Sequence, residues 1–156
     1  MQFQISPVAQ IASSISILAS WHHQQWQHLN DPIYDLKARI ADYRNIANAN
    51  QYPAMFVAHQ NSRPLGSIRL VENDMETHSE LSPWLASLYV HQDYRRNGIG
   101  TALIRTIEIV TSELKFKTIY LFTEDKSFLY EKMGWQVHCN EIYYNQATTI
   151  MKKILN

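Results

Sequence analysis

The chain has 156 residues, a formal net charge of zero and 46% apolar residues, as expected for one globular domain with a single hydrophobic core. The neutral charge argues against nucleic-acid binding, the single cysteine Cys139 excludes an internal disulfide framework, and the scattered histidines show no metal-ligand spacing. No apolar run approaches the roughly 18 residues of a membrane span, so we expect one cytoplasmic domain over residues 1–156, without a membrane or metal partner.

The N-terminal part predicts one strand followed by two amphipathic helices. Residues 2–5 form the strand, and Ser6-Pro7 has the composition of a helix start, with Ser6 as the cap and Pro7 at the first helical position. Apolar residues then recur every three or four positions from Val8 to His22, which predicts a helix of about four turns. Asp31-Pro32 repeats the cap and proline signal before a second helix, from Ile33 to Ala47.

The remainder predicts strands alternating with helices. Residues 54–59 and 65–71 form a hairpin, and the acidic stretch 72–82 has no periodicity. Four further segments are predicted strands, at 84–90, 118–123, 135–141 and 147–154, and a short helix is predicted at 127–133. With the helix that follows Gly100, the order is β-α-α-β-β-β-α-β-α-β-β, a single α/β domain.

A glycine turn joins the strand ending at Val90 to the longest predicted helix. That helix starts near Ile99, and its apolar residues continue at Leu103, Ile107, Val110 and Leu114. The first N–H groups of a helix lack internal partners and lie at the positive end of its dipole. Gly98 and Gly100 have no Cβ, and Arg95 and Arg96 add positive charge, so the turn favours a phosphate or pyrophosphate.

The glycine spacing alone does not identify the ligand, and an ordinary helix cap is the alternative. A P-loop would need Lys-Ser or Lys-Thr after its second glycine, but Thr101-Ala102 follows Gly100. A dinucleotide-binding turn would need three glycines, and this turn has two.

Two motifs together resemble the GNAT acyltransferases. Arg95-x-x-Gly98-x-Gly100 is similar to the family's Arg/Gln-x-x-Gly-x-Gly/Ala signature, preceded by Leu88-Tyr89-Val90 as in its fourth strand. The segment 128–135, FLYEKMGW, resembles the family's second motif, at the expected distance. The resemblance implies a mixed sheet of six to seven strands with about four helices, splayed between the fourth and fifth strands.

The resemblance also implies an acetyl-CoA site. The pantetheine arm would lie along Leu88, Tyr89 and Val90, and Thr123 would contact it where many relatives have asparagine. An N–H near Tyr89 or Val90 would polarise the thioester carbonyl. The pyrophosphate would bind the turn, which comprises Arg95, Arg96, Asn97, Gly98, Ile99, Gly100 and Thr101.

The resemblance implies direct attack of an amine on the thioester, with Tyr130 as general acid. Many relatives carry a glutamate on the fourth strand as base, but Trp84-Leu85-Ala86-Ser87 offers no carboxylate. Because an alkylamine is protonated at pH 7, a base is still needed. We expect Glu80, acting through water, with Ser87 at most holding that water. The alternative is that the acidic loop is only a solvated connection that attracts cations.

The acceptor is less well defined by the sequence. Trp21 and Trp26, with the segment 74–86, resemble a bacterial subgroup similar to aminoglycoside N-acetyltransferases, so a small-molecule primary amine is expected. The predicted pocket comprises Trp21, Trp26, Glu76, His78, Trp84 and Ser87. The alternatives are a protein lysine or N-terminal acetyltransferase, and a non-catalytic acyl-CoA-binding module. The resemblance also allows a homodimer, with Tyr143-Tyr144 in the interface or the core.

Overall fold

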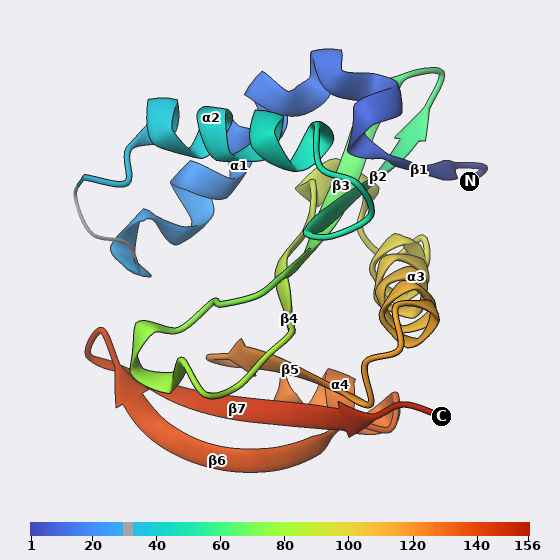
Figure 1. Cartoon of the computed structure of the whole chain (residues 1–156). Helices are drawn as coiled ribbons and strands as arrows, with labels where there is room; N and C mark the ends of the chain where they lie inside the picture. The colour runs from blue at the N-terminus through green and yellow to red at the C-terminus, as the bar shows by residue number, and fades with distance from the viewer. Residues whose placement is uncertain (30–32) are drawn as a thin grey trace.

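The computed structural model of the protein describes residues 1–29 and 33–156, and within them the chain forms one seven-stranded sheet with four α-helices (Figure 1). The strands are β1 Gln4–Pro7, β2 Ala54–Gln60, β3 Arg63–Val71, β4 Trp84–Val90, β5 Thr118–Thr123, β6 Gln136–Tyr143 and β7 Gln146–Ile154. The α-helices are α1 Ile15–Trp26, α2 Leu36–Ala47, α3 Ile99–Glu113 and α4 Ser127–Lys132. Short 3-10 segments are Val8–Ser14, Gln27–Leu29, Glu76–His78 and Gln92–Tyr94.

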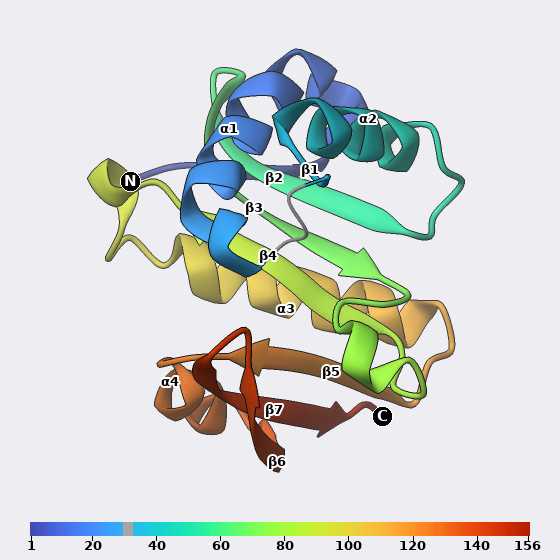
Figure 2. The same cartoon turned by 90° about the vertical axis from the view of Figure 1, so that its left-hand side faces the viewer.

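The sheet has the order β1-β2-β3-β4-β5-β7-β6, and its pairs are antiparallel except the parallel pair β4–β5. Helices α1 and α2 cover one face of the β1–β4 half, and α3 covers the opposite face (Figures 1 and 2). The expected α/β class, element order and mixed sheet are confirmed. No helix among the described residues is both long enough and apolar enough to cross a membrane.

The apolar spacing of α3 accounts for its place in the structure. Ile99, Leu103 and Ile107 are buried against the sheet, while Val110 and Leu114 pack at the edge of the same core. Ile109, on the other side of the helix, is exposed. A single apolar stripe on an otherwise polar helix therefore fixes which side of α3 faces the sheet, and so where its first turn lies.

The predicted helix start at Ser6-Pro7 is wrong. Both residues belong to β1, opposite Val57 and Phe56 of β2. The Ser6 hydroxyl hydrogen-bonds His59 Nε2 at 2.9 Å and does not cap a helix. Pairing with β2 satisfies several backbone groups at once, and an edge strand tolerates proline.

The second predicted helix is present and begins later than the sequence indicated. The signal at Asp31-Pro32 lies outside the described residues. Helix α2 starts at Leu36, and the Asp35 carboxylate accepts a hydrogen bond from Ala38 N at 2.8 Å. Asp35 is therefore the N-cap residue.

Strands β4 and β5 separate almost as soon as they meet. Their register contains one pair, Trp84 with Tyr120, supported by a hydrogen bond of 3.0 Å from Tyr120 N to Pro83 O. Beyond it, no strand of the described residues pairs with the β5-facing edge of β4. Backbone groups on such an edge need another partner, so the expected splay between the fourth and fifth strands is confirmed.

A bulge in β4 increases the separation. Ala86 pairs with Arg69 and Tyr89 with Ser67, so two residues of β4 oppose one residue of β3, and Ser87 has φ of 56°. Gly66 allows this close approach, because a Cβ there would lie 2.6 Å from Tyr89 O. A bulge bends the strand and redirects its side chains, here at the point where the strands part.

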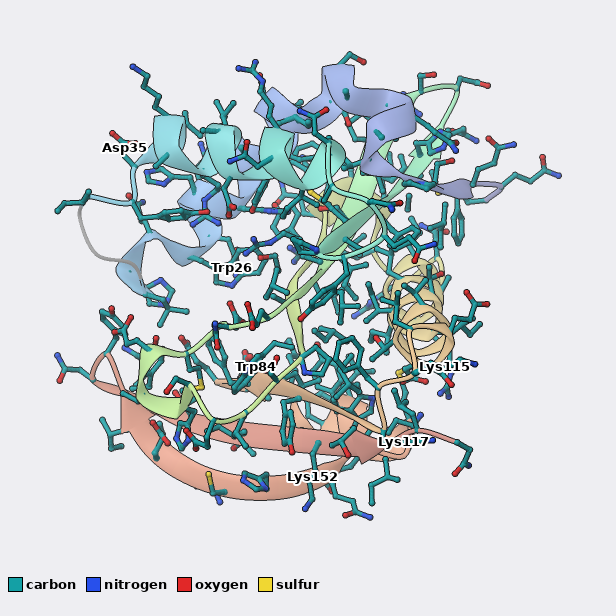
Figure 3. The ribbon with its side chains drawn as sticks, viewed as in Figure 1. Trp26, Asp35, Trp84, Lys115, Lys117 and Lys152 are labelled. Carbon is teal, nitrogen blue, oxygen red and sulfur yellow. The ribbon has the colours of Figure 1, made fainter. Side chains whose placement is uncertain are left out.

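Trp84 lies in the core and is not a pocket residue as the sequence suggested. It is 0% exposed, its indole N–H donates to Leu81 O at 2.7 Å, and it contacts the rings of Tyr120 and Phe122. It lies where β4 meets β5 (Figure 3).

Trp84→Ala is therefore expected to lower the free energy of unfolding by about 3–5 kcal/mol, because it leaves a large cavity. Urea unfolding followed by circular dichroism measures the change. Trp26→Ala removes a half-buried tryptophan and is the matched control, with an expected loss less than half as large. An unfolding midpoint for Trp84→Ala equal to wild type would contradict the core assignment.

Candidate active site

A cleft of about 710 Å³ opens where β4 and β5 part. Its walls come from β4, the first turn of α3, the end of β5 and the start of α4, with α1, α2 and β3 at one end. Thirteen of the predicted site residues line it. They are Trp26, Ser87, Leu88, Tyr89, Val90, Arg95, Arg96, Gly98, Ile99, Gly100, Thr101, Thr123 and Tyr130.

The first turn of α3 forms one end of the cleft. Gly98 is the N-cap with φ of 78°, a left-handed conformation that favours glycine, and a Cβ there would meet nothing within 4 Å. The space above it is open, and the first N–H groups of α3 have no intrahelical acceptor. Arg95 and Arg96 are exposed beside this turn. This end of the cleft therefore suits an anionic group.

Two side chains maintain the shape of the cleft near this turn. The Asn97 amide donates to the carbonyls of Tyr94 and Arg95, at 3.0 and 3.2 Å, and Asn97 itself does not line the cleft. The Thr123 hydroxyl accepts from Lys126 N at 3.0 Å, which leaves its O–H available as a donor. Asn97 thus orders the turn, and Thr123 links β5 to the start of α4.

Tyr130 lies on α4 with its ring 6% exposed and in edge contact with Trp135. Its hydroxyl has no hydrogen-bond partner in the described part of the chain. Burial raises the pKa of the Tyr130 phenol to about 12, so it stays protonated at neutral pH. The cleft therefore contains a hydrogen-bond donor with no competing acceptor.

Five other predicted residues do not line the cleft. Trp84 is in the core. Trp21 contacts the rings of Tyr89 and His91 but does not line the cleft itself. The other three belong to the acidic loop, which is attached to β6 and the turn after it and lies beside the β6–β7 hairpin (Figure 1).

The loop contacts explain where these three side chains lie. Glu76 accepts from the Tyr144 hydroxyl at 2.8 Å, and His78 hydrogen-bonds Glu141. Glu80 is bound to His78 at 2.9 Å, and its side chain is 64% exposed. The neighbouring carboxylates Glu141 and Glu80 raise the pKa of His78, while His78 lowers that of Glu80. These groups pair with one another and are outside the cleft.

Three charged residues that the sequence analysis did not select line the opposite end of the cleft: Asp74, Arg39 and Arg69. Arg69 donates to the Ser87 hydroxyl at 3.0 Å and to Asp42 at 3.3 Å, and its guanidinium lies over the Tyr43 ring. Ser87 therefore accepts a hydrogen bond from Arg69, and its own O–H remains available as a donor. Burial raises the pKa of Asp74 to about 7, although the charges of Arg69 and Arg39 act in the opposite direction.

A buried hydrogen-bond chain supports Arg39. Arg39 is 3% exposed and donates to the Tyr43 hydroxyl at 3.1 Å, and that hydroxyl is 2.6 Å from His22 Nδ1. His22 Nε2 is 2.9 Å from the Ser67 hydroxyl. Burial, with Arg69 and Arg39 nearby, lowers the pKa of His22, so the ring is neutral. Tyr43 then donates to Nδ1 and Nε2–H donates to Ser67, so both ring nitrogens of His22 are paired.

Two of these residues had a signal in the sequence. Arg69 interrupts the apolar strand 65–71, and Arg39 lies on the apolar side of its helix, four residues before Tyr43. A charged residue at a buried position needs partners and often marks a site. Asp74 had no such signal, because Glu72, Glu76 and Glu80 share its loop.

The family described as "Acetyltransferase (GNAT) domain" matches residues 51–137, which is more than half of the chain. The chain belongs to the GNAT acetyltransferase family. GNAT members are acyltransferases, so this chain is one as well. The matched region runs from the start of β2 to β6 and contains the glycine turn, β5 and Tyr130. No curated protein matches the chain significantly.

Solved structures share this GNAT fold over nearly the whole chain. The yncA acetyltransferase of Salmonella typhimurium, solved with acetyl-CoA, is 15% identical with a TM-score of 0.75, covering 100% of this chain and 95% of that one. An aminoglycoside 6'-N-acetyltransferase solved with coenzyme A is 16% identical with a TM-score of 0.75, covering 97% and 96%. A Staphylococcus aureus Mu50 N-acetyltransferase is 15% identical with a TM-score of 0.74, covering 100% of both. At these identities the likeness concerns the fold.

Proposed function

We propose that this GNAT protein transfers the acetyl group of acetyl-CoA to a primary amine of a small molecule, by direct attack within a ternary complex. The observation that carries the proposal is the cleft, which has the N-terminus of α3 with Arg95 and Arg96 at one end and Arg39, Arg69 and Asp74 at the other. Tyr130 lines the cleft as well. Both substrates can therefore bind at once, as direct transfer requires.

The residues present fit acetyl-CoA. The free edge of β4 at Leu88, Tyr89 and Val90 has backbone groups that a pantetheine arm would pair with, as an added strand does. The open space at Gly98 and the N–H groups of Ile99, Gly100 and Thr101 suit its diphosphate, with Arg95 and Arg96 beside it. The bound coenzyme supplies the reactive thioester.

In the proposed reaction Tyr130 donates a hydrogen bond to the departing sulfur. Its raised pKa keeps the proton on the phenol at neutral pH, and its hydroxyl has no competing partner in the described chain. A buried, protonated donor placed where negative charge develops lowers the barrier, because it needs no reorganisation during the reaction. An N–H at Tyr89 or Val90, just after the bulge, would polarise the carbonyl.

A small acceptor is favoured over a protein by the shape of the acceptor end. Trp26 and Leu29 contribute apolar surface there, and Arg39, Arg69 and Asp74 close it with charged groups. Similar structures include aminoglycoside 6'-N-acetyltransferases, which is consistent with a small amine. A protein N-acetyltransferase and a non-catalytic acyl-CoA-binding module remain the alternatives.

Thiol release from acetyl-CoA tests the proposal. The panel comprises ethylamine, spermidine, kanamycin, an amino-acid amide and a lysine-containing peptide, with calorimetry of coenzyme A in parallel. Release with a small amine supports the proposed function, and release with the peptide alone would favour a protein substrate. Coenzyme A binding with no release for any acceptor would favour the non-catalytic module.

A further inference from the structure

One carboxylate in the acceptor end of the cleft has no hydrogen-bond partner among the described residues. It belongs to Asp74, in the loop between β3 and β4. This loop is attached to β6 and the turn after it through His78–Glu141 and Tyr144–Glu76. The loop is therefore held against the β6–β7 hairpin, and Asp74 is the acidic residue of the loop that lines the cleft.

The groups around Asp74 come from several elements and nearly balance in charge. Arg69 of β3 and Arg39 of α2 are cationic, and Asp42 of α2 neutralises part of that charge through Arg69. Tyr143 of β6 also lines the cleft; burial raises the pKa of its phenol most, and the charges of Glu76 and Asp74 both raise it further. Within the described chain neither arginine donates a hydrogen bond to Asp74, so its carboxylate remains available to a ligand.

We infer that Asp74 binds the ammonium group of the acceptor and removes its proton, which makes it the general base of the acetyl transfer. This inference rests on the proposed function and replaces Glu80, whose carboxylate pairs with His78 outside the cleft. A half-buried carboxylate in a cleft attracts a cationic amine because the charge is poorly screened there. The class of acceptor is therefore an amine that is protonated in water.

The proton balance of the step follows from this assignment. The ammonium gives one proton to the Asp74 carboxylate, and the neutral nitrogen forms an N–C bond with the acetyl carbon. The C–S bond breaks as Tyr130 gives its hydroxyl proton to the sulfur, and the second nitrogen proton passes to the Tyr130 oxygen. Asp74 then releases its proton to water. The products are an acetamide, coenzyme A thiol and one proton.

Asp74→Asn is expected to lower kcat/KM for ethylamine by about 100-fold at pH 7.5, the lower part of the range for a lost general base. The wild-type kcat/KM should rise with pH through about 7, because only ionised Asp74 accepts a proton. This rise in kcat/KM near pH 7 should be absent from the pH profile of Asp74→Asn. Glu72→Gln alters an exposed carboxylate of the same loop and should leave the profile unchanged.

A matched pair of acceptors separates a base from a structural role. The amine 2,2,2-trifluoroethylamine has nearly the shape of ethylamine, but its fluorines leave it largely neutral at pH 7.5. The loss caused by Asp74→Asn should fall from about 100-fold with ethylamine to less than tenfold with the fluorinated amine. An equal loss with both acceptors at every pH would mean that Asp74 only balances Arg39 and Arg69, and would overturn the inference.

Carboxyl-carbon NMR provides a readout that does not depend on turnover. The Asp74 signal, assigned as the one missing from Asp74→Asn, should titrate near neutral pH and shift when ethylammonium chloride is added to the coenzyme A complex. A wild-type protein that acetylates no amine would contradict the proposed function. A signal that titrates at the usual acidic pH, or does not respond to ethylammonium, would overturn the Asp74 assignment. Loss of activity in Glu80→Gln with full activity in Asp74→Asn would also overturn it.

Discussion

Tyr130→Phe is expected to lower kcat by about 1,000-fold, in the middle of the range for loss of an acid-base group, while the Kd of coenzyme A stays within about threefold. The variant keeps the ring that packs against Trp135 and removes only the hydroxyl that faces the cleft. Binding should therefore persist while the departing sulfur loses its hydrogen-bond donor. Thiol release measures kcat, and calorimetry measures the Kd.

The pH profile adds a second check on Tyr130. Burial raises the pKa of the phenol to about 12, so the hydroxyl stays protonated to well above pH 9, and wild-type kcat should show no fall there from its ionisation. Tyr120→Phe is the matched control, because Tyr120 is a half-buried tyrosine of β5 outside the cleft lining. It should leave kcat unchanged. Undiminished turnover by Tyr130→Phe at every pH would show that Tyr130 is not the acid.

Gly98→Asp should weaken coenzyme A binding by about 100-fold. The substitution places a carboxylate in the open space above the first turn of α3, where we propose the diphosphate binds. Two like charges about 5 Å apart repel by about 3 kcal/mol at an effective dielectric constant of about 20. That energy corresponds to about 100-fold in Kd, which calorimetry would detect.

Two further variants separate the charge from the backbone and steric effects at Gly98. Asparagine has the size of aspartate and also tolerates the left-handed conformation, so Gly98→Asn isolates the negative charge. Gly98→Ala adds only a Cβ and reports the strain of φ 78°. We expect a loss of a few fold for each. Unaltered affinity in Gly98→Asp would place the diphosphate elsewhere.

Local sequence signals predicted well the elements around the glycine turn. The strand 84–90, the glycine turn and the strand 118–123 were predicted with their observed bounds, and Tyr130 was placed on the correct short helix. These features depend on interactions between residues close in the chain, such as apolar periodicity and the left-handed preference of glycine. The prediction from local signals was wrong at Ser6-Pro7, because these residues pair with β2 and do not cap a helix.

The acceptor end could not be predicted in the same way. Its loop carries Glu72, Asp74, Glu76 and Glu80, and nothing local distinguishes them. Contacts of Glu76 and His78 with the β6–β7 hairpin, more than sixty residues later in the chain, decide which carboxylate faces the cleft. The prediction of Trp84 as a pocket residue was wrong for a similar reason. Strands β4 and β5 still pair at Trp84 and separate only beyond it, which the local sequence does not indicate.

The sequence by itself determined the family, the α/β order of elements and the glycine turn before α3, since each depends on short-range patterns in the chain. The tertiary structure alone decided which charged side chains meet in the acceptor end of the cleft. Arg39, Arg69 and Asp74 come from a helix, a strand and a loop. Their burial and mutual charges, and hence the raised pKa of Asp74, exist only after these elements pack together.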